Sequence, residues 1–429
     1  MDNYDQIPLG KLLDSVTGGG TPSRNVPEFW NGIIPWASVK DFTDGESKLS
    51  NTQEFITELG LRNSTSKLIK KGTPIICLRM AVGRTAISNK DVSINQDLKA
   101  LFTKENVDSV YLIYLLDFMR TKVEARSIGS TVKGISTKDL LKIEVPFPKC
   151  LDSQKSISKI LSSVDSLVET TQNLIDKYTA VKQGIMADLF SRGIDLSGTA
   201  DINKNYGQLR PSYAEAPELY RETELGWVPN DWGVIKIDDI STQMTNGFVG
   251  VATPHYANEN EVGIRYLYGN NVRADKLELD TVLKIKPEFH QKLQKSQLRH
   301  GDMLTVQSGH IGTTAIVPEN FGEANCHALI ITRLVQAKIL PEFLSFYLNS
   351  AIGMNRMEEI FVGSTIKHVN VKELKSFLVP LPSIDEQKAA LDKIIGARKQ
   401  IDDETRYLEK LKLKKKGLMQ DLLTGKVTV

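Results

Sequence analysis

One block of sequence occurs twice in this chain. The first copy, GSTVKGISTKDLLKIEVPFP, runs from Gly129 to Pro148, and the second, GSTIKHVNVKELKSFLVPLP, runs from Gly363 to Pro382. The separation is constant along the block, since 363 − 129 and 382 − 148 are both 234 residues. Solenoid repeats have a period of only about 20–50 residues. A period this long equals a domain plus a connecting element, so the sequence indicates a tandem duplication.

A segment without proline follows each copy of the block. Each segment begins near a glutamine, Gln154 or Gln387, and the two end alike in KQGIMADLFSRG and KKGLMQDLLTGK. Apolar residues recur at helical spacing in both, which predicts long amphipathic helices over residues 149–192 and 383–426. Two such helices of matched length favour pairing with each other as a coiled coil. The alternative is that each packs only on its own globular domain.

The sequences upstream of the two blocks also correspond, although loosely. KGTPIICLRMAVGRTAI from Lys71 aligns with HGDMLTVQSGHIGTTAI from His300, and NQDLKAL from Asn95 aligns with NCHALI from Asn325. Short apolar runs with strand character, separated by Gly and Asn turns and followed by a short helix, are typical of α+β domains. We therefore expect a pseudo-twofold α+β protein of two globular domains and two long helices.

The repeat sets the expected domain boundaries. They are a first globular domain (1–148), a first long helix (149–192), a linker (193–224), a second globular domain (225–382) and a second long helix (383–426).

Composition excludes several classes of protein. Of 429 residues, 41% are hydrophobic and 25% charged, as in an ordinary globular protein. The longest apolar runs, such as YLIYLL, are too short to span a membrane, and the N-terminal sequence MDNYDQIPLGK does not resemble a signal peptide. The three cysteines are isolated, which argues for a reducing cytoplasm and against a disulfide framework or zinc site. We therefore expect a cytoplasmic protein that does not enter a membrane.

No catalytic motif is present in the sequence. The chain contains no phosphate-binding GxxxxGK[ST], no HExxH, no GxSxG and no NPPF/Y motif of adenine methyltransferases. Its six histidines are scattered at spacings that suit no metal ion. We therefore expect a binding protein without catalytic residues, metal or cofactor of its own.

Two groups of residues could contact nucleic acid. Each GST-K turn offers hydroxyls, backbone amides and a lysine to a phosphate, although such a turn could equally be a plain entry to a strand. Loop residues with planar, bidentate or amide groups could read base edges, although single aromatic residues more often belong to a core. The candidates are Arg24, Trp36, Arg79, Arg84, Ser130, Thr131 and Lys133 in the first half, and Tyr266, Asn270, Asn271, Arg273, Ser364, Thr365 and Lys367 in the second.

The repeated order of GST-K, VP-P, glutamine and long helix resembles the specificity subunit of Type I restriction-modification systems. The segment ELGWVPNDW from Glu224, which opens the second half, strengthens the resemblance, as do GGGTPS, WNGIIPWASVKD and GNNV, which are similar to the target-recognition domains of that family. The first half lacks its own G-VP-DW lead-in and begins with YDQIPLGKL. The resemblance extends over nearly the whole chain.

This resemblance implies a non-catalytic subunit that binds double-stranded DNA. The two target-recognition domains would each read one half of a bipartite, asymmetric target, and an antiparallel pair of helices would set the spacer between the halves. Two methyltransferase subunits, which bind S-adenosylmethionine, would dock on the helices, and a motor-nuclease (restriction) subunit can add cleavage. The rival hypothesis is a coiled-coil protein-interaction scaffold without DNA specificity. The loops carry no code from which bases can be assigned.

Overall fold

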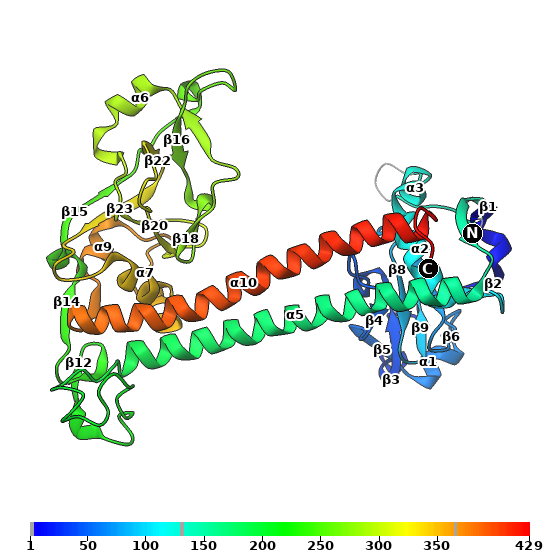
Figure 1. The fold of residues 1–429 in the computed structure, drawn as a ribbon, viewed down its shortest axis with the longest axis horizontal. Coiled ribbons are helices and arrows are strands. Elements are labelled where there is room, and N and C mark those ends of the chain that lie inside the picture. Colours follow the sequence, from blue (N-terminus) through cyan, green and yellow to red (C-terminus); the bar gives the residue numbers. More distant parts are fainter. Residues whose placement is uncertain (1–3, 129–132, 364–366) are drawn as a thin grey trace. The chain divides into compact units, whose positions relative to one another are not determined.

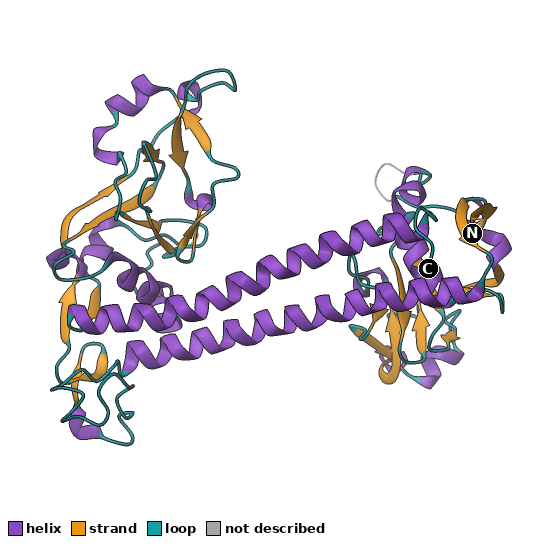
Figure 2. Ribbon diagram, viewed as in Figure 1, coloured by secondary structure: helices purple, strands orange, loops and turns teal. Residues whose placement is uncertain are grey.

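The chain folds into two compact units in the computed structural model, which describes residues 4–128, 133–363 and 367–429 (Figure 1). Unit 1 comprises Met1–Asn173 and Thr405–Val429, and unit 2 comprises Leu174–Glu404. Both combine helices with short strands, as the sequence predicted (Figure 2). No helix in these described ranges is long and apolar enough to cross a membrane.

Unit 1 contains two main sheets. The five-stranded sheet has the order β2 (Leu13–Gly18), β10 (Leu98–Thr103), β7 (Pro74–Cys77), β8 (Thr85–Ser88) and β4 (Lys48–Leu49). The four-stranded sheet has the order β5 (Glu54–Ile56), β3 (Trp30–Ala37), β9 (Val92–Ile94) and β6 (Leu68–Ile69). A separate pair joins β1 (Tyr4–Pro8) to β11 (Glu144–Pro148). The short helices are α1 (Glu58–Arg62), α2 (Ser109–Phe118), α3 (Arg120–Ala125) and α4 (Thr137–Leu141).

Unit 2 repeats this arrangement with differences in detail. Its four-stranded sheet has the order β15 (Ser241–Asn246), β23 (Leu329–Leu334), β20 (Met303–Val306) and β21 (Thr314–Ile316). Its three-stranded sheet has the order β19 (Leu283–Ile285), β16 (Ile264–Leu267) and β22 (Ala324–Cys326). Its strand pairs are β12 (Tyr220–Thr223) with β13 (Gly226–Pro229), β14 (Gly233–Lys236) with β24 (Leu378–Leu381), and β17 (Val272–Arg273) with β18 (Lys276–Leu277). Its short helices are α6 (Pro287–Lys292), α7 (Pro341–Asn349), α8 (Ala351–Glu359) and α9 (Val371–Ser376).

Two long helices, α5 (Leu151–Ser191) and α10 (Ile384–Leu423), contribute to both units. In unit 1, Ile157 of α5 lies in the same buried cluster as Leu422 of α10. In unit 2, Leu189 of α5 lies in the same buried cluster as Ile394 of α10. The ends of both apolar stripes therefore contribute to buried cores, whereas Leu167 and Val181 in the first stripe are each 47% exposed. The long helix predicted over the first stripe is present.

The glutamine that follows each repeated block is a buried structural residue. The Gln154 side chain accepts a hydrogen bond from Asp108 N (2.8 Å) and donates one to Pro148 O (3.0 Å). The Gln387 side chain accepts from Leu340 N (2.8 Å) and donates to Pro382 O (3.0 Å). Since both glutamines are fully buried, each satisfies backbone groups that water cannot reach.

The segment that links α5 to the second sheet system is anchored on Glu386, in the first turn of α10. The Glu386 carboxylate accepts hydrogen bonds from Ile194 N (2.8 Å), Arg210 Nη1 (2.5 Å) and Trp232 Nε1 (3.1 Å). The side chains of Arg210 and Glu386 are only 7% and 3% exposed. A buried ion pair thus fixes residues from this linker to the start of the helix.

Candidate nucleic-acid interface

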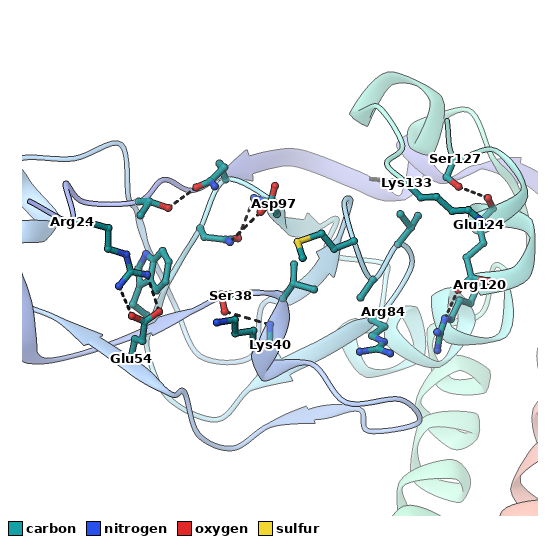
Figure 3. A pocket seen from close by; sticks show the side chains of 18 residues that line it. Arg24, Ser38, Lys40, Glu54, Arg84, Asp97, Arg120, Glu124, Ser127 and Lys133 are labelled. Carbon is teal, nitrogen blue, oxygen red and sulfur yellow. Dashed lines mark hydrogen bonds and ion pairs between the residues drawn. The ribbon is translucent and has the colours of Figure 1, made fainter. Parts of the chain in front are cut away.

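A cavity of about 790 Å³ opens in unit 1 (Figure 3). It lies between the end of β3 with the turn that follows it and a wall that contains α3 and Lys133. Arg24 and Glu54 are at one end of the cavity, and Arg120, Glu124 and Lys133 are at the other. Its charged lining residues are the five basic side chains of Arg24, Lys40, Arg84, Arg120 and Lys133 and the three acidic ones of Glu54, Asp97 and Glu124. The excess of basic groups suits an anionic ligand.

Arg24 and Glu54 form a fixed, partly exposed pair in this cavity. The two side chains are joined by two hydrogen bonds, one from each terminal guanidinium nitrogen, and that from Nη2 measures 2.9 Å. The guanidinium carbon lies 3.7 Å from the ring centroid of Trp30. The hydrogen bond from Arg24 holds the pKa of Glu54 below its ordinary value. The pair therefore presents an oriented donor beside an ionised acceptor, with exposed fractions of 53% and 36%.

The remaining cations of the cavity fall into two classes. Arg84 Nη2 and Arg120 Nη1 contact the carboxylate of Asp44 at 2.9 Å and 2.6 Å. Burial raises the pKa of Asp44, but the hydrogen bonds from both arginines outweigh it and leave this pKa below its ordinary value. Lys40 and Lys133, in contrast, are exposed and form no ion pair with any residue that the structure describes. These two ammonium groups are therefore the ones available to phosphates without breaking an existing ion pair.

Each unit contains a strand followed by a 3₁₀ turn that a side chain closes, and we call this combination the frame. In unit 1, Ser38 N donates to Asp41 Oδ2 (2.7 Å) across the 3₁₀ turn Val39–Asp41 that follows β3. In unit 2, Tyr268 N donates to Asn271 Oδ1 (2.9 Å) across the 3₁₀ turn Gly269–Asn271 that follows β16. Lys40 and Asn270 therefore occupy the same position in the two turns.

Charges differ between the two frames at six equivalent positions. The equivalences come from strand register, from matched backbone hydrogen bonds and from the neighbours of Gly83 and Gly312. The pairs are Lys40 and Asn270, Asp44 and Ala274, Glu54 and Leu283, Arg79 and Ser308, Arg84 and Thr313, and Arg120 and Met354. At each of these positions unit 1 has a charged residue and unit 2 an uncharged one. The Glu124 and Glu358 pair and the Lys133 and Lys367 pair keep their charge.

The structure also corrects one alignment made from the sequence. Asn95 N donates to Ala37 O (3.0 Å) in unit 1, and His327 N donates to Leu267 O (2.8 Å) in unit 2. His327 therefore stands at the position of Asn95, and the sequence alignment of Asn95 with Asn325 was wrong by two residues. Differences in chain length between the two frames caused the error, because a sequence alignment without gaps follows identical letters.

The predicted contact residues of the first half are partly brought together. Arg24, Trp36, Arg84 and Lys133 line the cavity, although Trp36 is buried and donates its Nε1 hydrogen to Gly20 O (3.0 Å). Arg79 does not line the cavity and pairs with Asp97 (3.4 Å). Ser130 and Thr131 lie outside the described residues.

The predicted contact residues of the second half differ in exposure, since some are exposed and others are buried. Asn270, Arg273 and Lys367 are exposed, and Arg273 pairs with Glu278 (3.2 Å). Tyr266 and Asn271 are buried, with the Tyr266 hydroxyl 3.2 Å from His327 Nδ1 and Asn271 closing its turn. Ser364 and Thr365 lie outside the described residues. Contact of any of the candidates with DNA stays a prediction.

Sequence reasoning did not select Lys40, Glu54, Gln96 or Arg120, which also line the cavity. The Ser-x-x-Asp spacing around Lys40 could have placed it on an exposed capped turn. No local signal marks Glu54 or Arg120, because their positions depend on contacts with residues distant in the sequence.

Comparison with known proteins identifies the family. The Type I restriction modification DNA specificity domain matches residues 1–179 and 229–413. The MjaVIII specificity subunit of a Type I restriction enzyme from Methanocaldococcus jannaschii is 22% identical over 437 residues, which cover 100% of this chain and 94% of the relative. The EcoR124I/EcoR124II specificity subunit from Escherichia coli is 31% identical over 176 residues, which cover 39% of this chain and 42% of the relative.

Solved structures share the fold. The S subunit of the Type I restriction-modification system from M. genitalium has a TM-score of 0.56 at 15% identity, covering 98% of this chain and 96% of that chain. A chain studied for complex assembly and conformational transition of the type I R-M system has a TM-score of 0.55 at 14% identity, covering 100% and 99%. Since the family match includes most of both halves, the chain belongs to the specificity subunits of Type I restriction-modification systems, which are non-catalytic recognition subunits.

Proposed function

We propose that this chain reads a bipartite, asymmetric target in double-stranded DNA, with one half read by each unit. The observation that supports this most strongly is the duplicated frame of strand and 3₁₀ turn, in which Lys40 and Glu54 of unit 1 are replaced by Asn270 and Leu283 of unit 2. A constant frame with different surface residues fits two readers of two different half-sites. Simple drift after duplication would not require the basic cavity of unit 1.

We infer that α5 and α10 form an antiparallel coiled coil that sets the spacer. In unit 1 the first part of α5 shares a core with the last part of α10. In unit 2 the last part of α5 shares a core with the first part of α10. At about 1.5 Å per residue, a helix of 41 residues is roughly 60 Å long. A rod of this length could hold two recognition domains on separate parts of one DNA duplex.

The partners that we propose follow from the family. Two methyltransferase subunits would dock on the helices, bind S-adenosylmethionine and methylate adenine, and a restriction subunit could join them. The duplication favours two copies of the methyltransferase, because equivalent framework surfaces can bind equivalent partners. This subunit would need no cofactor of its own, and the complex would act in the cytoplasm.

Methylome sequencing tests this proposal. The chain would be expressed with its methyltransferase in a host that lacks other methylation systems. We expect one motif with two defined halves separated by a fixed number of unspecified bases. Absence of any such motif would contradict the proposal.

Salt dependence separates DNA reading from the rival function, a coiled-coil scaffold that binds only proteins. Phosphate contacts make log K for DNA fall linearly with log salt concentration, with a slope set by the number of contacts. A scaffold that binds only proteins would have no salt-dependent affinity for a duplex. Titration of labelled duplex with the full chain alone at several salt concentrations therefore distinguishes the two functions.

A further inference from the structure

The two recognition surfaces differ in the chemistry that they can offer to a base pair. In unit 1, Glu54 pairs across the strands with Trp36, and its carboxylate holds the guanidinium of Arg24. In unit 2, Leu283 pairs with Tyr266 in the same register. The acidic group of one surface is therefore replaced by an apolar group on the other.

The charged surface matches a G·C pair. In the major groove, guanine presents two acceptors, N7 and O6, and its cytosine partner presents the N4 donor beside them. A guanidinium donates to both guanine acceptors, and a carboxylate accepts from cytosine N4. The hydrogen bonds within the Arg24–Glu54 pair leave Nε of Arg24 and further lone pairs of Glu54 for a ligand. Donor and acceptor thus lie next to each other, as do the guanine O6 acceptor and the cytosine N4 donor in the major groove.

The uncharged surface matches an A·T pair. An amide side chain both donates and accepts, so it can bind adenine N7 and N6, and apolar side chains contact the thymine methyl group. Asn270 is exposed on the turn that corresponds to that of Lys40, and Leu283 is 44% exposed. Neither surface position in unit 2 offers the cation that guanine favours.

We propose that the half-site read by unit 1 contains a G·C base pair contacted by Arg24 and Glu54, whereas the equivalent surface of unit 2 uses Asn270 and Leu283 to contact an A·T pair. This assignment rests on the proposed function, because it requires that each unit reads one half of the target. It gives the two half-sites different compositions and names the residues responsible.

The test uses the full chain in complex with its methyltransferase. The wild-type motif is first obtained by methylome sequencing, and binding is then measured with duplexes of about 30 base pairs carrying single base-pair changes. The variants are Arg24→Lys and Glu54→Gln in unit 1 and Asn270→Ala in unit 2. Arg24→Lys keeps the positive charge but cannot donate two parallel hydrogen bonds to guanine. Arg62→Lys is the matched control, because Arg62 pairs with Glu58 in unit 1 outside the cavity and both are well exposed.

The expected result is position-specific. Arg24→Lys and Glu54→Gln should each reduce discrimination by about 10- to 100-fold at one and the same G·C pair, and leave the other half-site unchanged. Asn270→Ala should relax an A·T pair in the other half, and Arg62→Lys should change neither. Thermal unfolding of each variant, compared with wild type, shows that the fold is retained, as expected for exposed side chains.

Two outcomes separate the levels of the proposal. A bipartite motif in which Arg24→Lys and Glu54→Gln relax no base pair, or relax an A·T pair, would overturn the assignment while leaving the proposed function intact. A motif with no division into two halves would overturn the proposed function itself, and the assignment with it.

Discussion

Replacing Glu386 by glutamine should loosen the linker of unit 2 strongly. The substitution keeps the shape of the side chain but removes the charge that faces Arg210 in a nearly solvent-free site. Arg210 would retain its ion pair with Asp231, whose side chain is 59% exposed. Removing one partner of a buried ion pair costs about 3–5 kcal/mol, because the other charge is left buried without compensation. We therefore expect a loss of about 3 kcal/mol in the stability of this region.

Hydrogen exchange measured by mass spectrometry reads this effect directly. Ile194 N donates to Glu386, so its amide should exchange on the order of 100-fold faster in the Glu386→Gln chain if opening of this region controls exchange. Amides of β7 in unit 1 provide an internal reference that should not change. Asp231→Asn is the matched control, since it removes the exposed carboxylate from the same arginine and should cost at most about 1 kcal/mol.

A double variant completes this test. Arg210→Met combined with Glu386→Gln removes both charges together, keeps a side-chain oxygen for Ile194 N and Trp232 Nε1, and should recover much of the stability lost in Glu386→Gln alone, because no buried charge remains unpaired. Equal exchange rates in the Glu386→Gln and Asp231→Asn chains would refute the reasoning. They would mean that losing the buried Glu386 carboxylate costs no more stability than losing the exposed Asp231 carboxylate.

Three further predictions concern charged groups. Lys133→Ala and Lys367→Ala should each weaken DNA binding without changing the motif and reduce the salt slope by about 0.9, as anisotropy titrations can measure; an unchanged slope would mean that these lysines do not contact phosphate. Asp44→Asn should free Arg84, whereas Arg120 still pairs with Glu124, and should steepen the same slope by about 1 unit; a shallower slope would contradict this. Burial raises the pKa of Asp117, so its ionisation opposes folding above the ordinary aspartate pKa of about 3.9. Asp117→Asn should therefore be more stable than wild type near pH 7, with an advantage that shrinks as pH falls toward 4; equal melting curves at all pH values would argue against it.

The duplicated framework was readable from sequence because its signals are local. The GST-K block, the buried glutamine and the apolar stripe are each defined by neighbouring residues, and the duplication repeats them. Gln154 illustrates the limit, since the repeat marked its position but only the fold reveals the backbone groups with which it forms hydrogen bonds.

The candidate nucleic-acid interface was less predictable because it depends on distant contacts. The Arg24–Glu54 ion pair requires that Glu54 is first placed by the pairing of β3 with β5. Arg84 and Arg120 are brought together because both donate hydrogen bonds to Asp44. Trp36 and Tyr266 could not be distinguished from exposed base readers, because burial of an aromatic side chain is set by the packing of the whole domain. The expected domain boundaries and the DNA contacts stay predictions.

The central claim, that the two long helices set the distance between two separately read half-sites, is tested most directly by lengthening them. Four residues would be inserted after Thr171 and four after Glu404, next to the boundaries between the two units. The insertions add about 6 Å to each helix, close to two base-pair steps of roughly 3.4 Å. Methylome sequencing should then find both half-sites unchanged and the unspecified middle longer by about two base pairs. A motif with the original spacer would contradict the claim that these helices hold the recognition domains apart.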